Sequence, residues 1–221
     1  MNILTIDTAT ELLDVSITTK TGSFHEHAIH SGFTHTQRLM PVIEALLAES
    51  SIPAAELDLV VCARGPGSFT GLRIGMATAK GLRASTGARL VSIPTLDALA
   101  YRYAWFNGIV VPVIDARKHR IYAAQYRTGV RLGDYLDIAP KELLPALPEG
   151  SPSLFTAVNP TLLSAVADDV PDASSDLTCS TGRAYAALGM KRLSERGADD
   201  ADSGPMYIRM SDAEEKMSAA R

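Results

Sequence analysis

The sequence predicts an α/β protein built from two related halves. Three observations support this. The first part alternates short apolar strands with amphipathic helical segments, a glycine-rich turn separates one strand from the next helix, and one strand–turn–strand pattern occurs twice. With 221 residues the chain has ample material for a hydrophobic core. We expect two subdomains with mixed sheets, residues 1–107 and residues 108–221, of which the second is smaller and eroded.

The first three strands are expected at residues 2–7, 15–18 and 24–29. The first is apolar and ends in Asp7, and the second alternates apolar and polar side chains as a half-buried strand does. Short polar turns join the three, which is typical of an antiparallel meander.

A helix follows, because apolar residues recur at the spacing of one helical face. These residues are Leu39, Val42, Ile43, Leu46 and Leu47. Thr34 or Thr36 could cap its start. Pro41 is tolerated only near the first turn of a helix, so we expect a late start or a kink there.

The first half then continues with a strand at residues 57–63, the glycine-rich turn, a second helix and a strand at residues 90–93. A helix capped by Thr95 is expected over residues 96–105.

The second half opens like the first. An apolar strand at residues 109–115 ends in an aspartate, and a polar turn leads into a strand at residues 121–126. Five prolines between residues 140 and 160 then predict loops. The charged end of the chain, from about residue 212, is expected to be solvated.

The composition excludes some classes of protein. A net charge of −4, with 46% hydrophobic and 21% charged residues, fits an ordinary globular protein and disfavours a general nucleic-acid binder. The sequence shows no aromatic–basic patch, which also disfavours a plain tRNA-binding module. We see no signal peptide and no apolar run of about 20 residues, so we expect a cytoplasmic protein without membrane contact.

The stretch at residues 64–75 reads RGPGSFTGLRIG, between a strand and a helix. Such a turn can bind an anion through its backbone N–H groups. It lacks the Gly-Lys-Ser/Thr of a Walker A loop and the spacing of a dinucleotide fingerprint. The alternative is that the glycines permit a tight turn and close packing. The candidate phosphate-loop positions are Gly65, Gly67, Ser68, Thr70 and Gly71.

The helix after this loop favours the packing interpretation. Small residues recur every four positions at Gly67, Gly71, Gly75 and Ala79, which would let another backbone approach. The helix is also apolar on several sides, so we expect a partner protein to cover it. The predicted interface residues on the two helices are Leu39, Ile43, Leu46, Leu47, Leu72, Arg73, Ile74, Met76, Ala77 and Lys80. Those of the first helix could serve the core, the partner seam, or both.

Asp7 and Asp115 each end a strand beside a tight turn. Such an acid can hold a metal–nucleotide complex or activate water, or it can cap the turn. No nucleophile–base–orienter set accompanies them, which favours capping. The histidines His25, His27, His30 and His35 lack metal-ligand spacing and are interpreted as surface residues, so no metal, cofactor or catalytic residue is expected.

Five segments in this order resemble the bacterial TsaB (YeaZ) family, and the match covers almost the whole chain. They are residues 6–11 (IDTATE), 35–41 (HTQRLMP), 64–75, 114–117 (IDAR) and 205–209 (PMYIR). The resemblance implies the actin-like ATPase (ASKHA, ribonuclease H-like) fold. It also implies a part in making threonylcarbamoyladenosine in tRNA, a modification whose catalytic transfer belongs to the paralogue TsaD.

The resemblance further implies the partners. The chain would form a heterodimer with TsaD and a homodimer when alone, in both cases through the two helices of the first subdomain. The TsaE ATPase would join the larger complex, and the chain would contact tRNA only as part of that complex.

One departure from the TsaD pattern bears on catalysis. TsaD carries an H-x-x-x-H metal pair, whereas the corresponding residues 94–100 here (PTLDALA) contain no histidine. This implies a non-catalytic scaffold or activator subunit. The alternative is an ATP-dependent kinase or hydrolase of the same fold, in which Asp7, Asp115 and the glycine loop would hold metal and phosphates.

Overall fold

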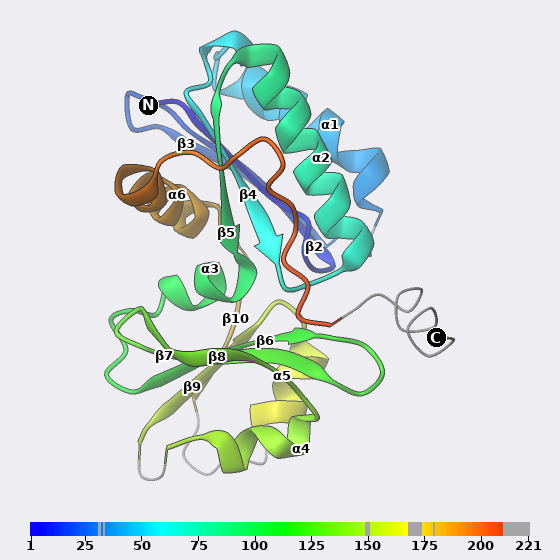
Figure 1. Ribbon diagram of the computed structural model, residues 1–221, viewed down its shortest axis with the longest axis vertical. Helices are drawn as coiled ribbons and strands as arrows, with labels where there is room; N and C mark the ends of the chain where they lie inside the picture. The colour runs from blue at the N-terminus through cyan, green and yellow to red at the C-terminus, as the bar shows by residue number, and fades with distance from the viewer. Residues whose placement is uncertain (31, 33, 149–150, 168–173, 179, 210–221) are drawn as a thin grey trace.

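The computed structural model describes residues 1–30, 32, 34–148, 151–167, 174–178 and 180–209. The charged segment expected from residue 212 lies outside the described residues. The first half forms a five-stranded mixed sheet (Figure 1). Its strands are β1 (Ile3–Asp7), β2 (Leu12–Thr18), β3 (Phe24–His30), β4 (Leu59–Gly65) and β5 (Arg89–Pro94).

Three α-helices connect or follow these strands: α1 (His35–Glu49), α2 (Phe69–Thr86) and α3 (Thr95–Tyr101), with a short 3-10 helix at Ala54–Glu56. The late start predicted for α1 is wrong, because the helix begins at His35 and Pro41 lies inside it. Helix α3 starts with Thr95 itself, after Pro94, and ends at Tyr101 rather than at residue 105.

The second half holds a second five-stranded sheet. Its elements are β6 (Ile109–Asp115), β7 (Ile121–Arg127), β8 (Val130–Ile138), α4 (Pro140–Leu143), a 3-10 helix at Leu144–Ala146, β9 (Ser153–Ala157), α5 (Pro160–Ala167), β10 (Ser174–Leu177) and α6 (Gly182–Arg196). The prediction of proline-rich loops is confirmed for Pro148 and Pro152, which lie outside helices and strands. It is wrong for Pro140 and Pro160, which each begin a helix, where the missing N–H is not needed. The second half keeps all five strands, but α4 and α5 are short.

The two sheets have the same topology, β3-β2-β1-β4-β5 and β8-β7-β6-β9-β10. In each, the first strand pairs antiparallel with the second and parallel with the fourth. Strand β6 is thus the counterpart of β1, and Asp115 occupies the place of Asp7. The repeat predicted from the sequence is confirmed.

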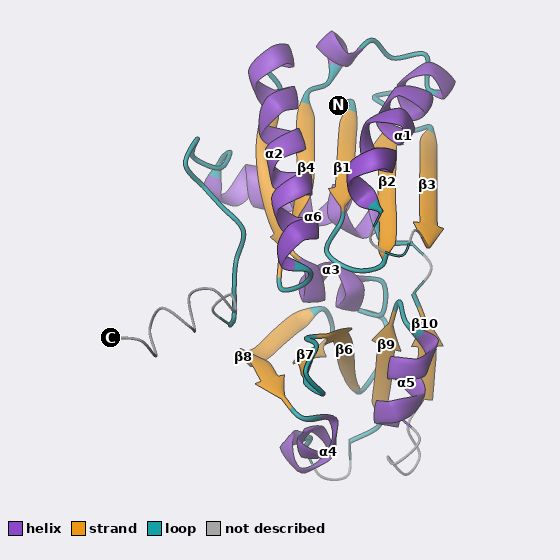
Figure 2. Cartoon of the chain, turned by 90° about the vertical axis from the view of Figure 1, so that its right-hand side faces the viewer, coloured by secondary structure: helices purple, strands orange, loops and turns teal. Residues whose placement is uncertain are grey.

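Helix α6 departs from the expected division of the chain. It lies in the range assigned to the second subdomain, yet it packs on β1, β2 and β5 of the first sheet. Figure 1 shows the first sheet nearly edge-on, with α1 and α2 on one side and α6 on the other. Figure 2 shows α1 and α2 side by side on their face of the sheet.

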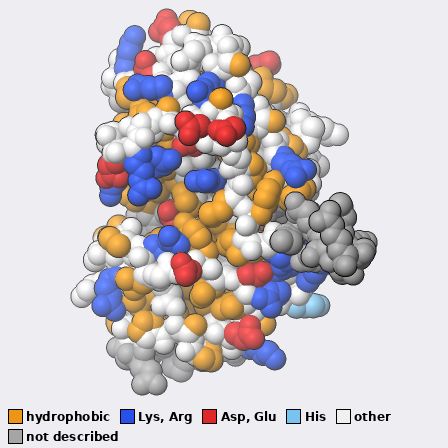
Figure 3. All heavy atoms as spheres, in the orientation of Figure 1, with side chains coloured by type: hydrophobic (Ala, Val, Ile, Leu, Met, Phe, Trp, Pro, Cys, Tyr) orange, Lys and Arg blue, Asp and Glu red, His pale blue; other side chains and the backbone are white. Residues whose placement is uncertain are grey.

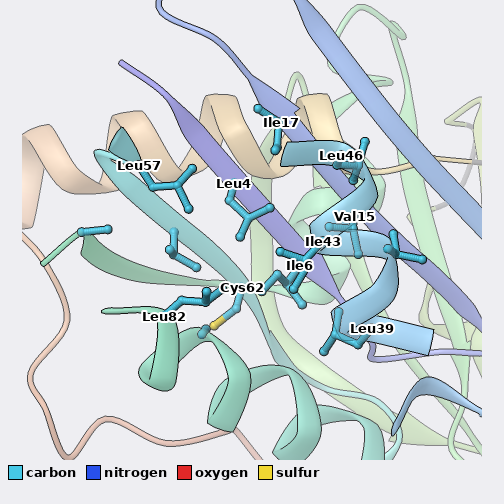
Figure 4. Packing of buried hydrophobic residues seen from close by; sticks show 14 of the residues in the cluster. Leu4, Ile6, Val15, Ile17, Leu39, Ile43, Leu46, Leu57, Cys62 and Leu82 are labelled. Carbon is cyan, nitrogen blue, oxygen red and sulfur yellow. The ribbon is translucent and has the colours of Figure 1, made fainter. Parts of the chain in front are cut away.

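The core of the first half lies between this sheet and the two helices (Figure 4). Leu4 and Ile6 of β1 point toward Ile43 and Leu46 of α1, and all four side chains are fully buried. Burying such a side chain stabilises the fold by about 1.5–3 kcal/mol. Among the described residues no helix is both long and apolar enough to cross a bilayer.

Candidate functional site

The glycine loop joins β4 to α2 through a cis peptide bond between Gly65 and Pro66. Gly65 and Gly67 have φ values of +112° and +159°, and Gly65 lies well inside the region that favours glycine. Ser68 is the N-cap of α2, and its hydroxyl accepts a hydrogen bond from Gly71 N at 3.2 Å.

The glycines of this loop pack α2 against the chain itself. A Cβ on Gly67 would overlap the Ala9 carbonyl oxygen, and a Cβ on Gly71 would overlap that of Thr8. The hydroxyl of Thr8 donates to Gly71 O at 2.8 Å. The close approach of another backbone predicted for these small residues is therefore confirmed at Gly67 and Gly71, and that backbone belongs to the loop after β1.

The loop does not fit a phosphate cradle. Two of its amides are already paired, because Ser68 N donates to Ala9 O at 2.6 Å and Gly71 N donates to the Ser68 hydroxyl. Thr70 is exposed and lies at the rim of a cleft. A phosphate could bind these two amides only if their present hydrogen bonds broke.

A cleft of about 680 Å³ lies between the two halves, next to this loop. It is lined by the loop, by the turn after β1, by the turn after β6 and by the segment 206–209. Both signs of charge are present, because Arg73 and Lys118 line the cleft as well as Glu11 and Asp115. Figure 3 shows hydrophobic and basic side chains together in this middle band of the molecule.

The segment 205–209 crosses from one half to the other. On the first half, Met206 N donates to Arg64 O at 2.7 Å, and the Tyr207 ring lies 4.9 Å from that of Phe69. On the second half, the Arg209 guanidinium donates to both carboxylate oxygens of Asp137, at 2.8 and 2.9 Å. This segment therefore ties the two sheets together.

Asp7 is buried below the cleft and does not line it. Its carboxylate accepts from Ala9 N at 2.9 Å and from the Thr181 hydroxyl at 3.3 Å. Burial raises the pKa of Asp7 to about 6. The side chain thus caps its own turn and joins β1 to the start of α6.

A second buried carboxylate lies opposite Asp7, because Asp7 and Asp14 are paired in the β1–β2 register. Both the amide and the hydroxyl of Thr181 donate to Asp14 Oδ2. Burial, followed by the charges of Glu26 and Asp7, raises the pKa of Asp14. Sequence reasoning missed Asp14, because strand alternation alone does not show that an acid at this position is buried.

Asp115 does line the cleft, and it caps its turn as Asp7 does. Its Oδ1 accepts from Arg117 N at 2.7 Å. After Ala116, the three residues Arg117, Lys118 and His119 all have positive φ, between 52° and 61°. Such conformations cost free energy in residues other than glycine, and Asp115 helps to hold them.

The predicted interface residues divide into two groups. Five of them belong to the core and are at most 4% exposed: Leu39, Ile43, Leu46, Leu72 and Met76. Of the others, Arg73 and Ala77 are exposed, and Leu47, Ile74 and Lys80 are partly buried. Helical periodicity could not separate these groups, since a core and an interface both require apolar residues.

We use "outer face" for the exposed or partly buried residues Met40, Leu47, Arg73, Ile74, Ala77 and Lys80 of α1 and α2.

One histidine is not a surface residue. His35 is buried, and its Nε2 lies 2.7 Å from Thr10 O. Burial lowers the pKa of this imidazole. Within the described parts of the chain, no three His, Cys, Asp or Glu side chains are grouped as a metal site would require.

Comparison with known proteins identifies the family. The family model for TsaD, tRNA N6-adenosine threonylcarbamoyltransferase, matches residues 29–149. Over 159 residues the chain is 31% identical to the tRNA threonylcarbamoyladenosine biosynthesis protein TsaB of Bacillus subtilis, a match covering 66% of this chain and 69% of that protein. Identity to the TsaB of Escherichia coli is 37% over 130 residues, 58% of this chain and 55% of that protein. A match to an uncharacterized Mycobacterium leprae protein, 38% identical, spans 59% of this chain and 36% of the relative.

Solved structures support the fold. YeaZ from Pseudomonas aeruginosa superposes with a TM-score of 0.77 at 22% identity, covering 94% of this chain and 99% of that one. The activator of 2-hydroxyisocaproyl-CoA dehydratase from Clostridium difficile, solved with bound ADPNP, gives a TM-score of 0.55 at 10% identity, covering 92% of this chain and 100% of that one. The two duplicated sheets have the actin-like ATPase architecture. On these matches in sequence and fold, the chain belongs to the TsaB (YeaZ) family.

Proposed function

We propose that the chain is a scaffold or activator subunit in the formation of threonylcarbamoyladenosine in tRNA, and that it binds a TsaD-type catalytic subunit through the outer face. Its curated relatives in Bacillus subtilis and Escherichia coli carry the name of this biosynthesis. The proposal assigns no catalytic residue, metal or cofactor to the chain.

The observation that carries the proposal is the outer face itself. Helices α1 and α2 lie side by side on one side of the first sheet, and no described helix or strand lies over them (Figure 2). Tyr207 of the segment 205–209 contacts the start of α2, where its hydroxyl accepts from Arg73 Nε at 3.1 Å. Met40 is 43% exposed on α1, and Ala77 is exposed on α2. Apolar side chains framed by Arg73 and Lys80 fit the apolar centre and charged rim of a protein interface.

The glycine loop supports a non-catalytic role. Ser68 N and Gly71 N are paired within the chain, and Asp7 is occupied in capping its turn. We propose that the same outer face forms a homodimer when the chain is alone, so that the TsaD-type partner competes with a second copy. A TsaE-type ATPase would join the larger complex, and tRNA would be modified within it.

Reconstitution tests this function. Purified TsaD-type and TsaE-type proteins from the same organism, the enzyme that makes the threonylcarbamoyl adenylate, and tRNA are combined with and without the full chain. Modified adenosine is then measured by mass spectrometry. We expect modification only when the chain is present. Equal modification without it would contradict the proposal, as would turnover of ATP by the isolated chain with magnesium, the result expected of a kinase or hydrolase.

A further inference from the structure

The cleft between the two halves has apolar and aromatic walls. Its volume of about 680 Å³ is in the range of ligand-binding sites in proteins. Phe69 and Tyr207 line it next to the first half, and Ile114 and Tyr122 belong to the second. Walls of this kind bury the apolar parts of a ligand, so a fitting ligand carries apolar groups beside any charge.

Positive charge prevails in the cleft, although the whole chain has a net charge of −4. The lining includes four basic and two acidic residues: Arg73, Arg117, Lys118, Arg209, Glu11 and Asp115. Of these, Arg117 pairs with Asp115 at 3.2 Å. Arg209 and Arg120 share one carboxylate, that of Asp137, so two arginines meet a single acid there. The balance favours a ligand with negative charge.

Arg73 is well placed to meet such a ligand. Its guanidinium lies 3.8 Å from the centre of the Phe69 ring and donates to the Tyr207 hydroxyl at 3.1 Å. These described partners are uncharged, so they orient the guanidinium without neutralising it. Arg73 is exposed, and its remaining N–H groups can pair with a carboxylate.

The chain itself delivers acidic residues to this place. The segment 205–209 runs from the first half to the second beside α2, and its last four residues line the cleft (Figure 1). The sequence then continues MSDAEEK at residues 210–216, which we call the acidic segment. A chain extends by at most about 3.6 Å per residue, so the Cα of Asp212 lies within about 11 Å of that of Arg209, and the Cα of Glu215 within about 22 Å.

We infer that the cleft is a binding site for an acidic peptide, and that the acidic segment of the same chain occupies it. The carboxylates of Asp212, Glu214 and Glu215 complement the excess of positive charge, and Met210 suits the aromatic walls. Tethering favours this occupant over a free peptide, because a short connection gives an effective concentration in the millimolar range.

This inference replaces the sequence-based expectation of a solvated end. That expectation considered only the charges of residues 212–216 themselves. The basic residues of the cleft come from α2, from the turn after β6 and from the segment 205–209. They form no charge run along the chain, so the sequence gave no sign of a complementary site.

Zero-length cross-linking of the full chain tests where the acidic segment lies. A carbodiimide activates a carboxyl group, which then forms an amide with a lysine amine that touches it. Trypsin cleaves after Arg209 and Lys216, so the segment is released as one peptide, and mass spectrometry identifies the lysine joined to it. We expect Lys118 to be joined within the monomer, and the yield to fall as salt is added.

Lys20 and Lys191 are the internal controls for this measurement. Their side chains are 67% and 69% exposed, so the reagent reaches them, and neither lysine lines the cleft. An acidic segment that moved freely in solvent would be joined to all three lysines. We expect the joint with Lys118 to exceed those with the two controls at least about tenfold, since the short connection raises the local concentration only at the cleft.

A labelled peptide of residues 210–216 measures the affinity of the cleft by fluorescence anisotropy. The wild type should bind it weakly, because its own acidic segment competes. The full-chain variant Asp212→Asn/Glu214→Gln/Glu215→Gln should bind it at least about tenfold more tightly. Adding Arg73→Glu to this variant should remove the gain. If that protein fails to fold, Lys118→Glu on the turn after β6 gives the same test.

The matched control variant neutralises three exposed acids outside the cleft and should bind the peptide as weakly as the wild type does. It is Glu195→Gln/Asp200→Asn/Asp202→Asn.

Three results would overturn the inference. The first is an acidic segment joined to Lys20 or Lys191 as often as to Lys118, or not joined to Lys118 at all. The second is a joint with Lys118 only in cross-linked dimers, which would assign the cleft to the segment of a second copy. The third is equal binding of the peptide by the two neutralised variants. These measurements need no TsaD-type protein, so their outcome is independent of the proposed function.

Discussion

Asp7 shows how burial turns one carboxylate into a pH-dependent element of stability. Burial raises its pKa from 3.8 to about 6, so the folded state holds this proton more tightly than the unfolded chain does. At low pH the carboxyl group is protonated in both states, and it does not lower the free energy of unfolding. Its contribution then destabilises the fold increasingly as the pH rises from about 4 to about 6, and the penalty stays constant above that.

Asp7→Asn removes this penalty while keeping an oxygen for Ala9 N. We expect the variant to be more stable than the wild type by up to about 3 kcal/mol at pH 7, and by only about 0.5 kcal/mol near pH 4. Urea unfolding of both proteins across this range measures the difference. The exposed Asp202→Asn should show no such trend. A gain for Asp7→Asn that is the same at both pH values would contradict the explanation.

Single residues were only partly predictable from the sequence. The turn-capping role favoured for Asp7 and Asp115 agrees with the hydrogen bonds that both make. His35 was interpreted as a surface residue, and it is buried. The difference arises because the partner of His35 is the carbonyl of Thr10, 25 positions away, and no local pattern indicates such a contact.

Helix α2 owes its position to glycines that differ in their surroundings. A Cβ on Gly71 would overlap the Thr8 carbonyl oxygen, whereas a Cβ on Gly81 would meet nothing within 4 Å. Gly71→Ala should therefore destabilise the fold by about 2 kcal/mol, because α2 must move away from the loop after β1.

Gly81→Ala, on the same helix, is the matched control. It should stabilise the protein by about 0.5–1 kcal/mol, since alanine loses less backbone entropy in a helix. Thermal or urea unfolding of the two variants provides the comparison. A Gly71→Ala protein as stable as Gly81→Ala would show that the close packing at Thr8 is not required.

The regular elements of the first half were predictable, and those at the end of the second half were not. Strands β1 and β6 are apolar and end in an acid, a strong local signal. Strands β9 and β10 have five and four residues, too few to show alternation. Helix α6 is the exception at the end of the second half, since Ala184, Tyr185 and Leu188 have helical spacing and do indicate a helix.

At the scale of the whole molecule, the two halves contain sheets of the same topology, and two segments connect one half to the other. Helix α6 returns from the second sheet to the back of the first, and Arg209 anchors the segment 205–209 to Asp137. Although partial burial acts to raise the pKa of Asp137, hydrogen bonds from Arg209 and Arg120 lower it overall. Neither connection was visible in the sequence, because both depend on contacts between distant segments.

The outer face is where the molecule is proposed to meet its partner. Ala77 is exposed on α2 between Arg73 and Lys80, so Ala77→Glu places a charge on this face without disturbing the core. Met190→Glu is the matched control: Met190 is 44% exposed on α6, and α6 packs on the opposite side of the same sheet.

The most direct measurement is the affinity of the full chain for the TsaD-type protein of the same organism, by calorimetry, for the wild type and both variants. We predict that Ala77→Glu weakens binding at least about tenfold, because a charge is buried without a partner, and that Met190→Glu stays within about twofold. Binding of a folded Ala77→Glu protein as tight as that of the wild type would contradict the proposed interface.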